Sequence, residues 1–195
     1  MPRHATRLDP RAPLVLDTRE LGRRPGSMRP VRVTVPAPVG WGLTLVEVPP
    51  GTDLALDLRL ESVMDGVLVS GVVRAEVAAE CGRCLTPLTD TVEADVQELF
   101  AYAPDAADDD VLALEGDLID LEPVVRDALV LSLPLNPLCD ADCEGLCVGC
   151  GERMRDLAPD HGHDEADPRW AALAALTTTP TGNEEPSTDE EETGS

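Results

Sequence analysis

Apolar and polar positions alternate with a period of two over much of residues 31–99, which is the pattern of β-strands that bury one face. The clearest run is 54–60, where four leucines alternate with charged or small residues. Asp65-Gly66 then supplies a hairpin turn, and the alternation resumes over 67–80. Shorter runs of the same kind predict further strands at 31–35, 43–48 and 88–99, and the apolar residues 14–16 are the first candidate for ordered structure.

One longer helix is predicted near residues 121–133. Leu121, Val125 and Leu129 follow the spacing of one helix face, Asp120 can cap the helix, and Pro134 ends it. A second Asp-Pro pair at 167–168 predicts a short C-terminal helix over 169–176. The fold class is therefore predicted as α+β: a mostly antiparallel β-sheet or partial barrel with one main helix, a cysteine-rich knuckle and a short C-terminal helix.

A chain of 195 residues predicts one domain, and we place it at residues 14–176. Residues 1–13 mix Arg, Pro and His without periodicity and are predicted to be disordered. Residues 177–195 hold six acids and no base and predict a disordered acidic tail. The acidic stretch 104–117 predicts a mobile loop.

The formal net charge is -23, yet residues 1–32 hold eight Arg against three acids. An acidic body repels the phosphates of nucleic acids, so a basic protein is the expected partner. No apolar run has the length of a signal peptide or a membrane span, which predicts a cytoplasmic protein with no membrane partner. No motif for a small-molecule substrate is present.

A basic loop is predicted at residues 21–29, where two glycines and a proline break the pattern. Its arginines, Arg23, Arg24 and Arg29, suit the binding of an anion, an RNA phosphate or an acidic surface. The alternative is a solvated loop that happens to be basic.

Eight residues of metal-binding type fall into three groups. Cys81 and Cys84 form one C-x2-C pair. Four more cysteines lie within twelve residues of the segment 137–165, and a histidine pair follows them in the same segment. Four such ligands complete a tetrahedral zinc site, so eight would satisfy two closed sites with none left over. We therefore expect structural zinc, as one or two ions. The second and third groups are Cys139, Cys143, Cys147 and Cys150, and His161 and His163.

Other interpretations of these groups stay open. A redox C-x2-C pair normally begins a helix, whereas Cys81 and Cys84 lie between two predicted strands. Free structural thiols and a surface histidine pair are the plainer alternatives. Our preferred partition places Cys81, Cys84, Cys139 and Cys143 on one ion and Cys147, Cys150, His161 and His163 on another. A ribbon-like site that joins the two C-x2-C pairs is the other partition.

Nothing in the sequence indicates an enzyme. With 38 acidic residues, neighbouring carboxylates arise by chance, and neither a glycine-rich phosphate loop nor a nucleophile elbow is present. A zinc ion whose four ligands all come from the protein keeps no open position for water. A metal-dependent RNA hydrolase would need such a position.

Five segments together resemble the actinobacterial branch of the YceD-like family, the large ribosomal RNA subunit accumulation proteins. The resemblance covers residues 14–176, with the motifs in the order of the family. It implies a non-catalytic role in the synthesis, processing or stability of 23S ribosomal RNA, often encoded beside a large-subunit ribosomal protein. The segments are 16–29, 80–85, 118–129, 138–151 and 167–173.

The resemblance also bears on the metal. Many relatives from other Gram-positive lineages have a C-x-C pair where this chain has His161-Gly-His163, an exchange that implies ligand roles for both histidines. Proteobacterial relatives keep only part of the cysteine set, which implies that metal serves folding in this branch rather than the activity of the whole family.

These observations lead to two functional hypotheses. The first is a zinc-stabilised factor for 23S rRNA accumulation and large ribosomal subunit biogenesis, which binds a ribosomal protein, the pre-ribosomal particle or pre-rRNA, with RNA contact through the N-terminal arginines. The alternative is a thiol-based redox or metal-sensing regulator that uses the C-x2-C pairs.

Overall fold

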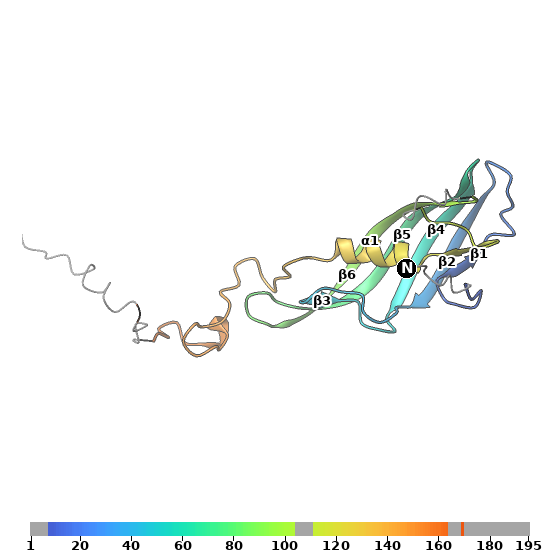
Figure 1. The fold of residues 1–195 in the computed structure, drawn as a ribbon. Helices are drawn as coiled ribbons and strands as arrows, with labels where there is room; N and C mark the ends of the chain where they lie inside the picture. Colours follow the sequence, from blue (N-terminus) through green and yellow to red (C-terminus); the bar gives the residue numbers. More distant parts are fainter. Residues whose placement is uncertain (1–7, 104–110, 164–168, 170–195) are drawn as a thin grey trace, which may run out of the picture. The chain divides into compact units, whose positions relative to one another are not determined.

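Long alternating runs of the sequence form one antiparallel β-sheet. The computed structural model describes residues 8–103, 111–163 and 169, and the chain divides into two units, 1–156 and 157–195. Every strand and helix given below belongs to the first unit (Figure 1). The elements are β1 (Val15–Asp17), β2 (Met28–Pro36), β3 (Val46–Glu47), β4 (Asp53–Ser62), β5 (Gly66–Glu80), β6 (Pro87–Ala101), β7 (Leu118–Asp120), α1 (Glu122–Ser132) and a 3-10 turn at Met154–Asp156.

The main sheet is built around β5. Strand β6 pairs with β5 along its whole length, from Gly66 opposite Ala101 to Glu80 opposite Pro87. Strands β4 and β3 share the other side of β5 at different ends, and β2 pairs with β4. The described strands form an open sheet with β2 and β6 at its edges, which confirms an α+β fold with a mostly antiparallel sheet that does not close into a barrel.

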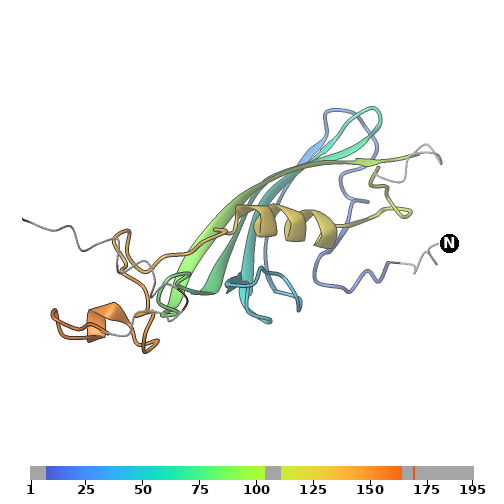
Figure 2. The same ribbon diagram turned by 60° about the vertical axis from the view of Figure 1, so that its left-hand side comes forward.

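One face of the sheet carries the core. The four leucines of β4 are all buried, because alternate side chains of a strand point to the same face. Helix α1 lies across this face beside β6 and buries Val125 and Leu129 (Figure 2). The opposite face meets solvent, and exposed ion pairs such as Arg32 with Asp57 join its strands. The core is almost wholly aliphatic, with Trp41 and Phe100 as its buried aromatic side chains.

Helix α1 begins close to the predicted residue. The backbone places its N-cap at Leu121, and the Asp120 carboxylate accepts a hydrogen bond of 2.9 Å from the N–H of Glu122. Asp120 thus satisfies one of the N–H groups that the start of a helix leaves unpaired, which is the role predicted for it. It does so from the position before the N-cap residue. Leu133 returns to an extended conformation before Pro134.

Two features depart from the sequence prediction. Strand β7 was not predicted, and it forms because Ile119 pairs with Leu16 of β1. The prediction of a mobile loop over 104–117 is wrong from Leu112 onward, since Leu112 and Leu114 pack against the core and bond to Ala101. Residues 1–7, 104–110, the acidic tail and the predicted C-terminal helix beyond residue 169 lie outside the described residues. No helix among the described residues is long and apolar enough to cross a membrane.

Candidate metal centre

The first cysteine pair lies at the tip of the β5–β6 hairpin. The N–H of Cys81 donates to the carbonyl of Thr86 at 2.9 Å, and the N–H of Leu85 donates back to the carbonyl of Cys81 at 2.9 Å. This closes a tight turn in which Leu85 adopts the left-handed conformation, with φ of 55°. Both cysteines are buried, at 0% and 1% exposure. The turn therefore aims two sulfurs into the protein.

The segment after α1 returns to this tip. The N–H of Gly82 donates to the carbonyl of Pro137 at 2.8 Å, and the guanidinium of Arg83 donates to the carbonyls of Ala141 and Cys143 at 3.2 and 2.9 Å. The approach is close, because a Cβ on Gly82 would lie 2.1 Å from Oδ1 of Asn136. These bonds bring a second pair of cysteines to the hairpin.

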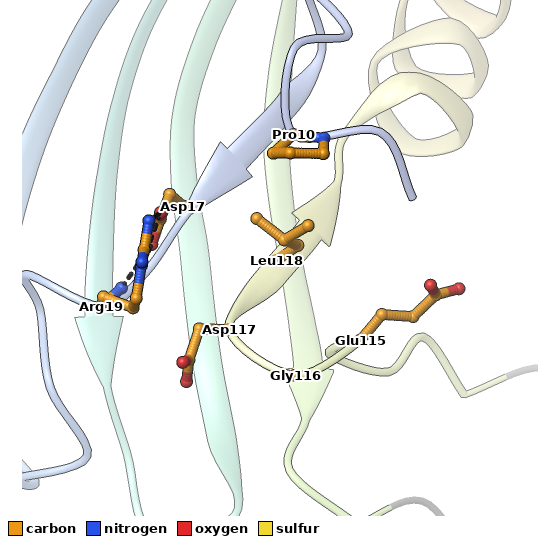
Figure 3. Close-up of a pocket in the computed structure, with 7 residues that line it drawn as sticks. All are labelled: Pro10, Asp17, Arg19, Glu115, Gly116, Asp117 and Leu118. Atoms are coloured by element: carbon orange, nitrogen blue, oxygen red, sulfur yellow. Dashed lines mark hydrogen bonds and ion pairs between the residues drawn. The ribbon is translucent and has the colours of Figure 1, made fainter. Parts of the chain in front are cut away.

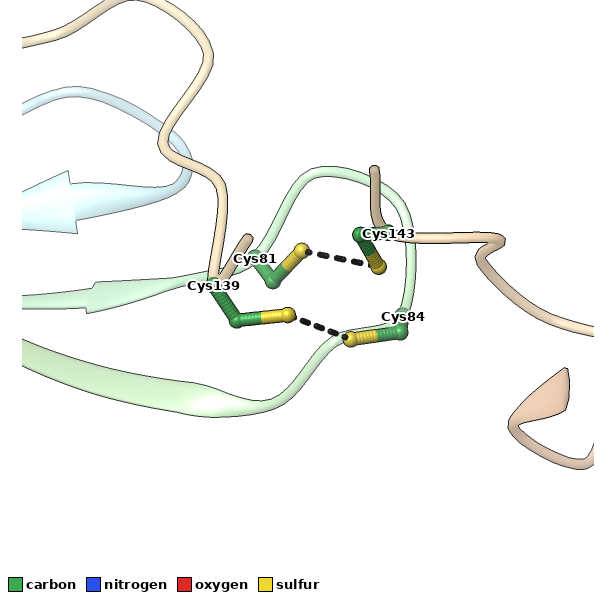
Figure 4. Close-up of side chains that lie close together, drawn as sticks. All are labelled: Cys81, Cys84, Cys139 and Cys143. Carbon is green, nitrogen blue, oxygen red and sulfur yellow. Dashed lines mark hydrogen bonds between the residues drawn. The ribbon is translucent and has the colours of Figure 1, made fainter. Parts of the chain in front are cut away.

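Four sulfurs converge there, those of Cys81, Cys84, Cys139 and Cys143, all within 4.8 Å of one another (Figure 4). The Sγ atoms of Cys81 and Cys143 lie 3.8 Å apart, and those of Cys84 and Cys139 lie 3.5 Å apart. Zinc–sulfur bonds of about 2.3 Å in a tetrahedron place neighbouring sulfurs about 3.8 Å apart, whereas a disulfide needs about 2.05 Å. The arrangement thus fits a tetrahedral ion and not a pair of disulfides.

The four thiols differ in their pKa values. The pKa of Cys81 is lowered to about 6, chiefly by the backbone N–H of Cys139, and that of Cys84 is lowered chiefly by the hydroxyl of Thr86. The hydrogen bond with Cys84 raises the pKa of Cys139 to about 12, and burial is the main cause that raises the pKa of Cys143. The surroundings thus shift two of the thiols toward the thiolate and two away from it. A divalent cation at the centre would stabilise the thiolate at all four.

Cys147 and Cys150 lie on a second small turn. The N–H of Gly151 donates to the carbonyl of Cys147 at 2.8 Å, and the N–H of Cys147 donates to the carbonyl of Glu152 at 2.7 Å. Arg153 fastens this turn to the hairpin tip, because its Nε donates to the carbonyl of Cys84 at 3.1 Å. The sequence prediction of a knuckle therefore corresponds to a defined turn.

His161 and His163 belong to the second unit. The N–H of His161 donates to the carbonyl of Ala158 at 2.9 Å, which forms a turn. The two imidazole rings meet edge to face, with their centroids 4.7 Å apart. The histidines thus lie close enough to each other to act together, and their sharing of an ion with Cys147 and Cys150 stays a prediction.

The predicted arginine loop faces the chain's own acidic residues. Arg23 lies 3.7 Å from the carboxylate of Asp117 and stacks over the ring of Tyr102, with 5.0 Å between guanidinium carbon and ring centroid. Arg29 lies 3.5 Å from the carboxylate of Glu20 and donates to the carbonyl of Asp17 at 3.1 Å. These partners were not predicted from the sequence, because they can lie far away along the chain. Asp117, for example, is 94 residues from Arg23. A role in partner binding stays a prediction.

A cavity of about 470 Å³ opens beside this loop (Figure 3). Asp17 and Arg19 form an ion pair on one side of it, Glu115 lies on the other, and Asp117 lies between them. The hydrogen bonds from Arg19 hold the pKa of the Asp17 carboxyl at about 2. Its lining thus holds three acids against one arginine, which disfavours the binding of a phosphate here.

Fold and site together define the class: an α+β protein in which four cysteines, from a hairpin tip and from the segment that follows the helix, converge. The family model for large ribosomal RNA subunit accumulation protein YceD matches residues 69–177, from β5 onward, and includes every predicted metal ligand. The chain belongs to this family.

Relatives support the match. The uncharacterized protein Rv2926c of Mycobacterium tuberculosis is 44% identical over 170 residues, which cover 85% of this chain and 82% of the relative. The large ribosomal RNA subunit accumulation protein YceD of Haemophilus influenzae is 33% identical and covers 56% of this chain and 65% of its own length. A chloroplastic YCED homolog of Arabidopsis thaliana is 23% identical, covering 67% of this chain and 50% of the homolog. No solved structure matches the chain.

Proposed function

We propose that this protein acts as a non-catalytic factor for the accumulation of 23S ribosomal RNA and the assembly of the large ribosomal subunit. Membership of the family carries the proposal, since the matched region holds most of β5 and all of β6, α1 and the cysteines. The test is to delete the gene in its host and measure the ratio of 23S to 16S rRNA. The deletion lowers the ratio and the intact chain restores it; an unchanged ratio would overturn the proposal.

Its partner in this proposal is a basic ribosomal protein, free or on the pre-ribosomal particle. The net charge of -23 supports an acidic surface that attracts such a partner. Capture on immobilised protein therefore weakens as salt rises from about 50 to about 300 mM, because exposed charges are screened. Failure to recover any ribosomal component at low salt would count against it.

Contact with rRNA through the arginine loop is a separate part of the proposal. Arg24 suits the test, because the ion pairs of this loop involve Arg23 and Arg29 instead. Arg24→Ala lowers the rRNA recovered with the protein and leaves its stability unchanged. Arg11→Ala, another exposed arginine of the N-terminal segment, is the control. Equal rRNA recovery with both variants would exclude the loop.

The metal in this proposal is structural zinc. Cys81, Cys84, Cys139 and Cys143 would hold one ion, which the spacing of their sulfurs supports. Two thiolates and two imidazoles, from Cys147, Cys150, His161 and His163, would hold a second. The ions would take part in no reaction step. They would link segments that have little hydrophobic core of their own. Elemental analysis with thiol counting before and after chelation tests both: two ions and no reactive thiols are expected.

The alternative of a thiol-based regulator needs thiols that an oxidant or partner can reach. Burial of Cys81 and Cys84 counts against it, as neither side chain is more than 1% exposed. Mass spectrometry after mild oxidation of the metal-loaded protein distinguishes a thiol-based regulator from a protein with structural zinc. A reversible Cys81–Cys84 disulfide with measured loss of partner binding would favour the regulator.

A further inference from the structure

Strand β6 is an open edge of the sheet. Its register with β5 runs without a bulge, so the backbone groups of alternate residues point away from β5 along its whole length. The N–H of Cys81 donates to the carbonyl of Thr86, so the backbone groups of the even-numbered residues of β6 point toward β5. Those of the odd-numbered residues point outward, as the bond from the N–H of Ala101 to the carbonyl of Leu112 shows. The backbone groups of Thr91, Glu93, Asp95, Gln97 and Leu99 therefore point outward.

The two edges of the sheet differ. Directly after β2, the N–H of Ala37 donates to the carbonyl of Thr52, directly before β4. The backbone groups of the even-numbered residues of β2 therefore point outward, and these residues include Pro30 and Pro36. Proline at an outward position removes the donor that an added strand would need, which is a usual protection of an edge. From Leu88 to Ala101 strand β6 has no proline. Among the described residues, the outward N–H groups of Thr91 and Leu99 bond only to the neighbouring side chains of Asp90 and Glu98.

The open edge is acidic. Strand β6 carries Asp90, Glu93, Asp95 and Glu98 and no base, and no Lys or Arg occurs between Cys84 and Val125. Glu93 pairs with Arg74 of β5, whereas Asp95 and Glu98 take part in none of the ion pairs found in the described part of the chain. A basic segment would therefore meet uncompensated negative charge beside outward backbone groups.

A groove lined by both polar and apolar residues accompanies this edge on the core side. It has a volume of about 340 Å³ and runs between β6 at Asp95–Glu98 and the helix α1. Val124, Ala128 and Leu131 line its helical side, and the Leu131 side chain is 86% exposed. Because side chains of a strand alternate between faces, a strand added to β6 would point every second side chain into this groove.

We propose that the β6 edge from Thr91 to Leu99 binds an extended basic segment of a partner protein as an added β-strand. Its basic side chains meet Asp95 on the solvent face, and its alternate apolar side chains enter the groove beside α1. Main-chain hydrogen bonds would supply affinity, and the alternation of basic and apolar residues would supply specificity. The inference deepens the proposed function and rests on it for the partner's identity as a ribosomal component.

The experiment uses the full chain and a fluorescein-labelled peptide of nine alternating Lys and Val residues. Fluorescence anisotropy measures its binding to the wild type, with a peptide of the same length in which alternate residues are Pro as the control. Gln97→Pro removes one outward N–H and leaves the β5 ladder intact, so it weakens binding about tenfold or more. Thr34→Pro, at an outward position of the β2 edge, changes binding less than about twofold.

A second variant covers the case in which Gln97→Pro unfolds the protein. Asp95→Asn leaves the backbone unchanged, weakens binding and flattens its dependence on salt. Equal affinity of the Lys-Val and Pro-containing peptides, or undiminished binding to folded Gln97→Pro, would overturn the proposal, as would preferential binding of an oligoribonucleotide at this edge. If Gln97→Pro binds no peptide yet restores 23S rRNA fully, the edge proposal fails and the proposed function stands.

Discussion

The Sγ atom of Cys84 lies 3.5 Å from the Sγ atom of Cys139, although 55 residues separate them in the sequence. Between them run the whole of β6, β7 and α1. A bond to a shared ion would close this long loop and fix the segment after the helix against the hairpin tip. Such closure removes conformational entropy that the segment would otherwise keep.

The first prediction concerns this link. Cys84→Ser removes one buried sulfur from the four-thiol centre, so the protein loses one bound ion and the segment 137–156 becomes sensitive to protease. The sheet keeps its circular dichroism because its core does not include the centre. Cys150→Ser, at the exposed thiol of the second set, is the matched control and loses the other ion only. Identical metal content in both variants and the wild type would refute the assignment.

The second prediction concerns the left-handed residue at the hairpin tip. Leu85 has φ of 55°, a conformation that costs a residue with a Cβ about 1–2 kcal/mol. Leu85→Gly relieves this strain and loses about 0.5–1 kcal/mol through chain entropy, so its unfolding free energy stays within about 1 kcal/mol of the wild type. Leu85→Val, which is β-branched, is destabilised by more than about 1 kcal/mol. Urea denaturation measures both, and a strongly destabilised glycine variant would contradict the explanation.

The third prediction separates the two leucines of α1. Leu129 is fully buried and Leu131 is 86% exposed, although they lie two residues apart. Leu129→Ala lowers the unfolding free energy by about 2–5 kcal/mol because it leaves a cavity in the core. Leu131→Ala changes it by no more than about 0.5 kcal/mol, yet it weakens binding of the Lys-Val peptide. Thermal denaturation and anisotropy measure the two effects, and equal losses of stability would contradict the packing of α1.

The fourth prediction concerns Asp17. Hydrogen bonds from Arg19 lower the pKa of its carboxyl from 3.8 to about 2. A lowered pKa in the folded state means that the interaction stabilises the fold above the unfolded pKa and is lost as pH falls through about 2. NMR titration of the carboxyl measures the midpoint directly. Arg19→Gln returns the midpoint toward 3.8, and an unchanged midpoint in that variant would exclude the cause.

Much of the fold follows from local pattern. The strands β4, β5 and β6 and the helix α1 were predicted because each has enough residues for a period of two or 3.6 to be visible. Strand β7 has three residues, too few for a period, and it exists through its pairing with β1. The prediction of a mobile loop was wrong from Leu112 onward for the same reason, since the two leucines are ordered by distant parts of the core.

The candidate site divides in the same way. Residue type and spacing marked every cysteine of the four-sulfur cluster as a ligand candidate, and both partitions remained open because spacing carries no information on distant neighbours. The partners of Arg23 were not found either, since neither Asp117 nor Tyr102 has a local signal.

By itself the sequence determined the period of each long element, the acidity of the body and the kinds of atoms that can bind a metal, because these are properties of neighbouring residues. Tertiary structure decided which sulfurs meet, which edge of the sheet stays open and which arginines are paired with acids. These depend on contacts between residues far apart in the chain, and the free energy of such contacts comes from packing and hydrogen bonds that only the folded backbone brings into range.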